Sequence, residues 1–217
     1  MKTARLSNGK EFPIGKILCI GRNYVDHISE LGNEVPTAPV IFMKPATAVI
    51  YDGEEVVVPD YSDNCHHEAE LALLIGQQCK GVAEEEALGC VAGYGVAIDL
   101  TLRDVQDGLK KKGLPWDIAK GFDTACPLSE FAPAAEVSDP QNLNIRLTVN
   151  GELRQNGSTA LMINSAARLV SHLSAIFTLE PGDIILTGTP AGVSRVCSGD
   201  RLCAEISGVG RVEVSVH

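Results

Sequence analysis

The stretch at residues 65–76, CHHEAELALLIG, constrains the fold of this chain more than any other part of the sequence. An apolar run of strand length, bounded by polar residues and a glycine, predicts a β-strand. Residues 71–75 are apolar at every position, which predicts that both faces of the strand are buried. Because side chains two apart on a strand share a face, Glu68 and Glu70 are expected to point the same way.

Two carboxylates at the mouth of a buried strand are costly to remove from water unless a cation meets them. A hard divalent ion such as Mg²⁺ or Mn²⁺ would meet that need, because these ions prefer carboxylate oxygens. Asp99, near the end of the apolar stretch 90–100, is a natural third ligand. The alternative is that Glu68 and Glu70 lie on a solvated rim, since an E-x-E pattern alone has little specificity.

A histidine and a glutamate share one face of a short predicted helix within residues 21–33. Asn23 is its expected N-cap, and Gly32-Asn33 its expected end. His27 and Glu30 are three residues apart, so the carboxylate would raise the basicity of the imidazole and fix its tautomer. This pair suits a base that activates water, and an ordinary ion pair on a helix surface is the alternative.

Further polar residues follow the second apolar run. Residues 101–112 are expected to form a helix that carries Arg103 and Gln106 on one face, close to Asp99. The lysines at 110–112 are interpreted as solvated cations in the last turn, where they favour the helix dipole. Lys120 is expected in a loop at 113–123, between small residues that permit close approach of a ligand.

The remaining pattern predicts more strands than helices. Hairpins are expected at residues 1–13, at 144–155 around an Asn-Gly turn, and at the end of the chain. A helix is expected at 162–177, and a strand at 184–187 leads into the glycine-bounded turn 188–192, whose backbone N–H groups suit a carboxylate. We therefore expect one strand-rich α+β domain spanning 1–217, with residues 1–15 as an arm or hairpin.

The composition excludes several classes of protein. The net charge of −10 argues against a nucleic-acid surface, and no run of 18 apolar residues exists to span a membrane. The N-terminus lacks the apolar core of a signal peptide, and the seven scattered cysteines contain no C-x-x-C pair. We expect a cytoplasmic protein with reduced and mostly buried thiols, which draws in any anionic substrate through local cations.

Taken together, these stretches resemble the fumarylacetoacetate hydrolase family, in its short single-domain acylpyruvase/oxaloacetate decarboxylase branch. The resemblance extends from about residue 15 to the end of the chain, and several long motifs in the right order are far more specific than any one pair. The motifs on which the resemblance rests are GRNYVDH (21–27), HHEAEL (66–71), DLTLRDVQ (99–106), LPWDIAKGFD (114–123), VNGELRQ (149–155) and PGDIILTGTPAGV (181–193).

The resemblance implies a mixed β-sandwich roll with a few short peripheral helices, a homodimer, and one Mg²⁺ or Mn²⁺ as cofactor. It implies that Glu68, Glu70 and Asp99 hold the metal, and that His27 and Glu30 form a water-activating dyad on a lid. Lys120 would share in catalysis by stabilising an enolate. The substrate contacts it implies are Arg22, Arg103, Gln106 and Thr189.

The function implied is hydrolysis of the C–C bond of acylpyruvates, such as acetylpyruvate or fumarylpyruvate, to pyruvate and a carboxylic acid by way of a metal-stabilised pyruvate enolate. Decarboxylation or keto–enol tautomerisation of oxaloacetate at the same site is the alternative. A metal-stabilised binding protein without catalysis would not need the His27–Glu30 pair. An EF-hand-like Ca²⁺ site is not indicated, because its D-x-D-x-D-G loop is missing.

Overall fold

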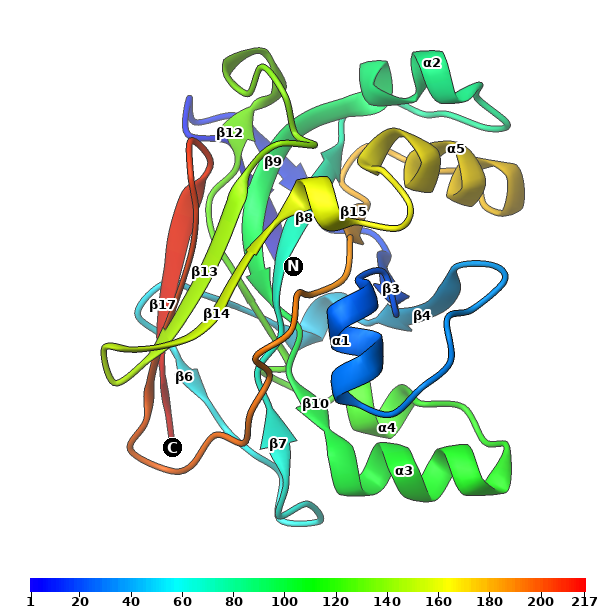
Figure 1. Ribbon diagram of the computed structural model, residues 1–217. Coiled ribbons are helices and arrows are strands. Elements are labelled where there is room, and N and C mark those ends of the chain that lie inside the picture. Colours follow the sequence, from blue (N-terminus) through cyan, green and yellow to red (C-terminus); the bar gives the residue numbers. More distant parts are fainter.

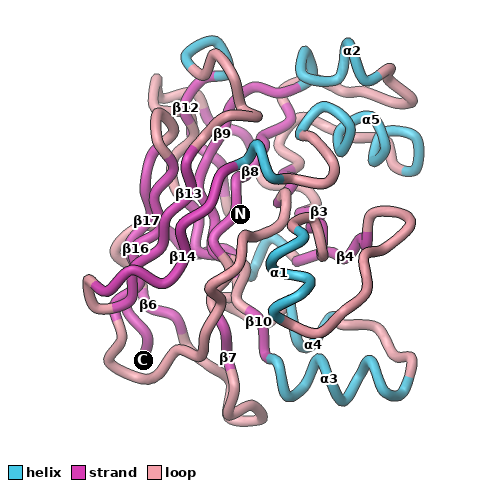
Figure 2. Tube along the Cα trace, viewed as in Figure 1, coloured by secondary structure: helices cyan, strands magenta, loops and turns pink.

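Two β-sheets packed against each other form the centre of the computed structural model, which describes residues 1–217 (Figure 1). The five-stranded sheet lies to the left in this view, and most of the helices lie to the right of the larger sheet. Figure 2 shows that more of the chain lies in strands than in helices. The strand-rich α+β class expected from the sequence is confirmed.

The larger sheet is mixed and has β8 near its middle. β8 (Ala69–Ile75) is fully buried, and it pairs antiparallel with β15 (Ile184–Leu186) on one side and with β9 (Val91–Ile98) on the other. The second sheet packs on one face of this strand, and the apolar side chains on both faces match its complete burial. The other strands of this sheet are β3 (Ile17–Gly21), β4 (Val40–Lys44), β5 (Val49–Tyr51), β11 (Cys126–Leu128) and β12 (Ala132–Pro133).

The second sheet has five strands and contains two hairpins. Asn150 and Gly151 connect β13 and β14 with φ angles of 54° and 81°, as the Asn-Gly turn predicted. The buried side chains of β13, β16 and β17 alternate with more exposed ones and face the larger sheet. The strands are β6 (Glu55–Val56), β13 (Asn144–Val149), β14 (Glu152–Ser158), β16 (Arg201–Ile206) and β17 (Gly210–Val216).

Two small pairs of strands lie outside these sheets. β1 (Thr3–Arg5) and β2 (Glu11–Pro13) form the expected N-terminal hairpin. β7 (Cys65–His66) pairs with β10 (Thr101–Leu102), which brings the residues just before Glu68 beside those just after Asp99. This pairing sets the position of the candidate site.

The helices form two groups (Figure 1). α2 and α5 pack together at one end of the molecule, while α1, α3 and α4 lie at the other end, near β3 and β4. None of the helices is long and apolar enough to cross a membrane. The helices are α1 (Val25–Glu30), α2 (Glu84–Ala87), α3 (Arg103–Lys112), α4 (Asp117–Lys120) and α5 (Ala166–Ile176), with 3-10 turns η1 (Ala46–Ala48), η2 (Leu88–Cys90), η3 (Ala134–Glu136) and η4 (Thr159–Leu161).

One continuous core joins the two sheets. Leu71 of β8, Val96 of β9 and Leu147 of β13 belong to the same cluster of buried residues. The seven cysteines form no disulfide, and five of them are buried, as expected of small apolar side chains. The five buried cysteines are Cys19, Cys65, Cys79, Cys90 and Cys126.

Three local predictions from the sequence are wrong. The helix expected within 21–33 is only α1, and Asn23 does not cap it, because the Asn23 side chain bonds to Asn164 and to the Thr187 carbonyl. The helix expected from residue 162 begins at Ala166, where Ser165 provides the N-cap. The loop expected at 113–123 contains the short helix α4, which ends at Lys120.

Candidate metal centre and active site

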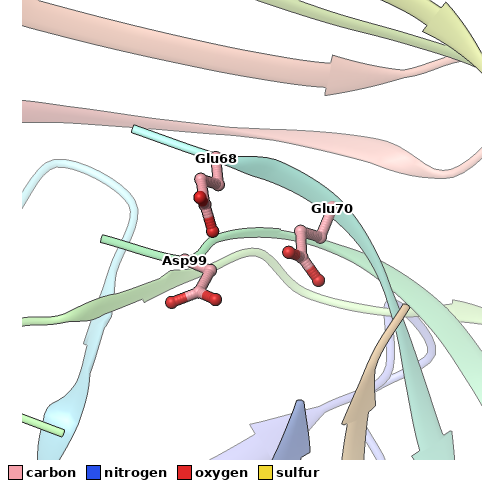
Figure 3. Close-up of side chains that lie close together, drawn as sticks. All are labelled: Glu68, Glu70 and Asp99. Carbon is pink, nitrogen blue, oxygen red and sulfur yellow. The ribbon is translucent and has the colours of Figure 1, made fainter. Parts of the chain in front are cut away.

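Three buried carboxylates converge at the ends of β8 and β9 (Figure 3). Glu68, Glu70 and Asp99 each offer an oxygen, and these atoms all lie within 4.8 Å of one another. Their exposed fractions are only 4%, 2% and 1%. The antiparallel register places Ala69 opposite Ile98, and the Asp99 N–H donates to the Glu68 carbonyl at 2.7 Å, so the backbone itself brings the three acids together.

The electrostatics of this cluster suit a divalent cation. Burial raises the pKa of Glu70 well above its usual value, and the negative charges of Asp99 and Glu68 raise it further. The Oδ1 atom of Asp99 is buried without a hydrogen bond, although it lies 2.8 Å from the Lys44 ammonium. Three hard oxygen donors, among which Glu70 has no ion pair with a cation of the chain, fit Mg²⁺ or Mn²⁺.

Cations of the chain border the carboxylates. The Lys120 ammonium lies 2.8 Å from Glu68 and 2.6 Å from Asp99, and Arg103 also pairs with Glu68. Burial acts to raise the pKa of Glu68, but Arg103, Lys120 and His27 outweigh it and hold that pKa well below its usual value. Lys44 also borders the cluster. The sequence places it at a strand end before Pro45, where sites are often built, but it was not among the assigned site residues.

The predicted pair on α1 faces these acids. Nδ1 of His27 lies 3.4 Å from Glu30, and Nε2 lies 3.9 Å from Oε1 of Glu68. Burial lowers the pKa of His27 below its ordinary value, and Arg103 acts in the same direction. The imidazole is therefore neutral near pH 7, and a proton on Nδ1 facing Glu30 leaves Nε2 free to accept one.

Helix α3 contributes Arg103 and Gln106 from one face. Both are buried, and Arg103 donates to the Gln106 amide oxygen at 3.1 Å. Lys110, one turn further along, lines the same pocket, so the interpretation of the lysine triplet as merely solvated is wrong for its first member. The pocket is lined by Gly21, Arg22, His27, Leu31, Asn33, Phe42, Glu68, Arg103, Gln106, Lys110, Trp116 and Lys120.

The turn after β15 closes the other side of the site. The Gly188 N–H donates to Glu70 at 2.6 Å. The Thr189 hydroxyl donates to the Ala69 carbonyl at 2.9 Å and accepts from the Gln155 amide at 2.7 Å. The hydroxyl thus holds this turn to β8, and Gln155, whose role the sequence did not indicate, supports it.

Six of the ten predicted site residues line this pocket, and the other four adjoin it through direct neighbours; the four are Glu30, Glu70, Asp99 and Thr189. Arg22, with a φ angle of 60° that is unusual for a residue with a side chain, lies at the edge of the pocket. A larger cavity, of about 710 Å³, lies elsewhere and contains none of the ten. The convergence of charged, buried groups identifies the smaller pocket as the candidate active site.

Comparison with known proteins matches both the fold and the sequence. The model of the fumarylacetoacetate hydrolase C-terminal family covers residues 16–217. The chain is 52% identical over 201 residues to mitochondrial oxaloacetate tautomerase FAHD1 of Bos taurus, covering 93% of this chain and 91% of the relative. It is 49% identical over 199 residues to oxaloacetate tautomerase YcgM of Escherichia coli, covering 91% of each.

A solved structure extends the comparison to the tertiary level. Fumarylpyruvate hydrolase from Pseudomonas aeruginosa, in complex with Mn²⁺ and pyruvate, has a TM-score of 0.95 and 37% sequence identity. The match covers 99% of this chain and 95% of that one. On its sequence, its fold and its buried acidic site, the chain belongs to the fumarylacetoacetate hydrolase family.

Proposed function

We propose that this protein is a divalent-metal-dependent oxaloacetate keto–enol tautomerase. The proposal is supported by the 52% and 49% identity to proteins named as oxaloacetate tautomerases. It reverses the order of preference reached from the sequence, which placed acylpyruvate hydrolysis first. One observation carries the chemistry: Nε2 of His27 lies 3.9 Å from Glu68 of the acidic cluster, where burial lowers the pKa of the imidazole and so favours the form that accepts a proton.

The metal-binding residues in this proposal are Glu68, Glu70 and Asp99. Held by these carboxylates, Mg²⁺ or Mn²⁺ would supply Lewis acidity that polarises the 2-oxo group of the substrate and acidifies the neighbouring C3–H. The Gly188 N–H fixes the Glu70 carboxylate, and Lys120 partly neutralises the other two acids. The chain thus holds the acids in place with groups that bind them from several sides.

Proton transfer is assigned to the pair on α1. His27 would take the proton from C3 of keto-oxaloacetate on Nε2, and Glu30 would stabilise the imidazolium that forms. Lys120, close to Glu68 and Asp99, would stabilise the negative charge that develops on the 2-oxo oxygen. Delivery of the proton to that oxygen gives the enol, and the same steps in reverse give the keto form.

Substrate positioning is assigned to groups around this centre. Arg103 and Gln106 form one wall, and their mutual hydrogen bond fixes the guanidinium in the pocket. The turn at Thr189 would bind the carboxylate next to the 2-oxo group through its backbone, because its hydroxyl is already used to hold the turn. Arg22 is proposed to contact the substrate from the pocket edge.

The direct test is the rate of enol-to-keto conversion of oxaloacetate with Mg²⁺ or Mn²⁺, compared with an enzyme-free blank. We expect conversion far above the blank, and its loss after EDTA treatment with recovery on adding metal. Decarboxylation and cleavage of acetylpyruvate and fumarylpyruvate are measured on the same preparation. A higher kcat/KM for any of those reactions would reject tautomerisation as the principal activity.

Hydrolysis of acylpyruvates is the second candidate. Its support is the TM-score of 0.95 to a fumarylpyruvate hydrolase, together with a His27–Glu30 pair that could equally deprotonate a water molecule. The nucleophile would then attack the distal carbonyl, and the C–C bond would break to give pyruvate after protonation. The His27→Ala variant separates these reactions from decarboxylation, because loss of CO₂ from oxaloacetate needs neither an attacking water nor a base.

Assembly and location complete the proposal. The homodimer and the cytoplasmic location expected from the sequence stay predictions. Light scattering coupled to size exclusion would test the first, and fractionation of cells would test the second. The substrate class is a small 2-oxo or 2,4-dioxo acid in either case.

A further inference from the structure

One face of α3 carries three polar residues that reach progressively outward from the acidic cluster. Arg103, Gln106 and Lys110 have the spacing i, i+3, i+7, so they lie on one side of the helix. Arg103 and Gln106 are buried, whereas the Lys110 side chain is 28% exposed. Lys110 therefore stands at the outer part of the same pocket that Glu68 and His27 line at its inner end.

The outer part of the pocket combines an aromatic wall with two cations. The Lys110 ammonium lies 5.4 Å from the centre of the Trp116 ring, and the centres of the Trp116 and Phe42 rings are 5.9 Å apart. Arg22 lines the pocket with Lys110, and its guanidinium is oriented by a 2.8 Å hydrogen bond to the Asn33 side chain.

These two cations lack a strong anionic partner of their own. Asp107 lies 3.6 Å from Lys110 but is 61% exposed, and an exposed ion pair of this kind contributes little. Arg22 makes its hydrogen bond to a neutral amide. Partial burial lowers the pKa of Lys110. Asp107 acts to raise that pKa, whereas the positive charges of Arg103 and Arg22 lower it further. A bound anion would relieve the repulsion among these cations.

We propose that Arg22 and Lys110 form a binding site for a second carboxylate of the substrate, so that the enzyme selects dicarboxylic 2-oxo acids over monocarboxylic ones. The inference rests on the proposed function, in which the 2-oxo acid end of the substrate occupies the acidic cluster. It makes Lys110 a specificity residue. In a chain with a net charge of −10, two such cations also offset the general repulsion of a dianion.

The test compares oxaloacetate with its 4-ethyl ester, which lacks the distal charge and carries an ethyl group in its place; both compounds can tautomerise. Lys110→Met keeps much of the aliphatic length of the side chain and removes the charge. Lys111→Met is the matched control, because Lys111 is exposed on the same helix and does not line the pocket. Lys110→Arg tests rescue by another cation.

We expect Lys110→Met to raise KM for oxaloacetate about 5- to 30-fold, as for loss of an interaction worth about 1–2 kcal/mol. The ester should change by less than about 2-fold, which is within the range of surface substitutions. Lys111→Met should resemble the wild type for both substrates, and Lys110→Arg should retain most of the preference for the diacid.

Calorimetric titration of the same two compounds into Mg²⁺-loaded protein that also carries His27→Gln, which removes the proposed base, reads the preference in binding with turnover suppressed. Equal binding of diacid and ester by the protein that keeps Lys110, or equal losses for both in Lys110→Met, would overturn the inference while leaving the tautomerase proposal intact. Absence of tautomerisation together with a Lys110-dependent preference in binding would reject the proposed function and retain the second carboxylate site.

Discussion

Nδ1 of His27 lies 3.4 Å from one carboxylate oxygen of Glu30, one turn later on α1. The other oxygen of Glu30 accepts the N–H of Gly192 at 3.0 Å. Glu30 therefore orients the proposed base and also fastens α1 to the turn that contains Gly188 and Thr189. The Glu30 side chain thus links the helix that carries the base to the turn that borders Glu70.

Removing the base should affect turnover more than binding. We expect His27→Gln to lower kcat for tautomerisation about 10²- to 10⁴-fold, the usual contribution of a general base, with KM changed much less. Asp26→Asn, an exposed change on the same helix, is the control and should leave kcat intact. Stopped-flow absorbance of the enol measures both variants, and an undiminished kcat in His27→Gln contradicts the assignment.

Metal binding should stabilise the fold through the acidic cluster. At a metal concentration about 100 times Kd, we expect a gain of about 2.7 kcal/mol, which corresponds to a rise in Tm of roughly 5–10 °C. Glu70→Gln should abolish this rise without lowering the Tm of the metal-free protein, because it removes a buried charge repelled by Asp99 and Glu68. Differential scanning calorimetry with EDTA or Mg²⁺ makes the comparison.

The exposed variant Glu85→Gln is the control for that experiment and should respond to metal as the wild type does. A Tm that rises equally with metal in Glu70→Gln would show that the ion binds elsewhere.

The backbone at Gly192 should tolerate no side chain. Its φ angle is 101°, and an added Cβ would lie 2.1 Å from the Arg154 carbonyl oxygen. Gly199 has a similar φ angle of 90° but open space around the same position, so it is the matched control. We expect Gly192→Ala to cost about 3 kcal/mol of unfolding free energy and Gly199→Ala about 1 kcal/mol.

Urea unfolding measures both glycine variants. The Gly192→Ala protein should also lose kcat, because its shifted turn releases Glu30. Equal free-energy losses in the two variants would show that the conformation alone, and not the contact with Arg154, makes Gly192 necessary.

Stability should fall as the pH drops below about 6.5, the ordinary pKa of histidine. Burial lowers the pKa of His66 to about 4, with the positive charge of Arg103 acting in the same direction. Between these values the unfolded chain binds a proton that the folded chain does not, so acidification favours unfolding. The effect should not saturate until the pH falls to about 4.

His66→Gln should make this fall shallower. Between pH 7 and pH 5, the Tm of His66→Gln should fall by at least about 2 °C less than the Tm of the wild type. His217→Gln, at the exposed C-terminus, is the control and should leave the slope unchanged. Thermal unfolding in EDTA at both pH values tests this, and parallel curves for wild type and His66→Gln would refute it.

The sequence by itself determined the elements whose signals are local. The apolar run after Glu70 specified a strand buried on both faces, and the Asn150-Gly151 turn specified its hairpin, because side-chain periodicity and turn chemistry act over a few residues. The long motifs indicated the family and the ten site residues. Periodicity alone left Glu68 and Glu70 open to a solvated rim.

Only the tertiary structure decided how distant residues meet. Asn23 looks like a helix cap in sequence, yet it binds Asn164 and Thr187, because contacts across more than 140 positions outweigh a local capping preference. Lys110 and Lys111 are adjacent residues of the same type, and the sequence does not distinguish them. The orientation of α3 places only Lys110 in the lining of the pocket. The meeting of Glu68 and Glu70 with Asp99 likewise depends on the pairing of β8 with β9, since strand register is set by packing between segments that a local pattern does not relate.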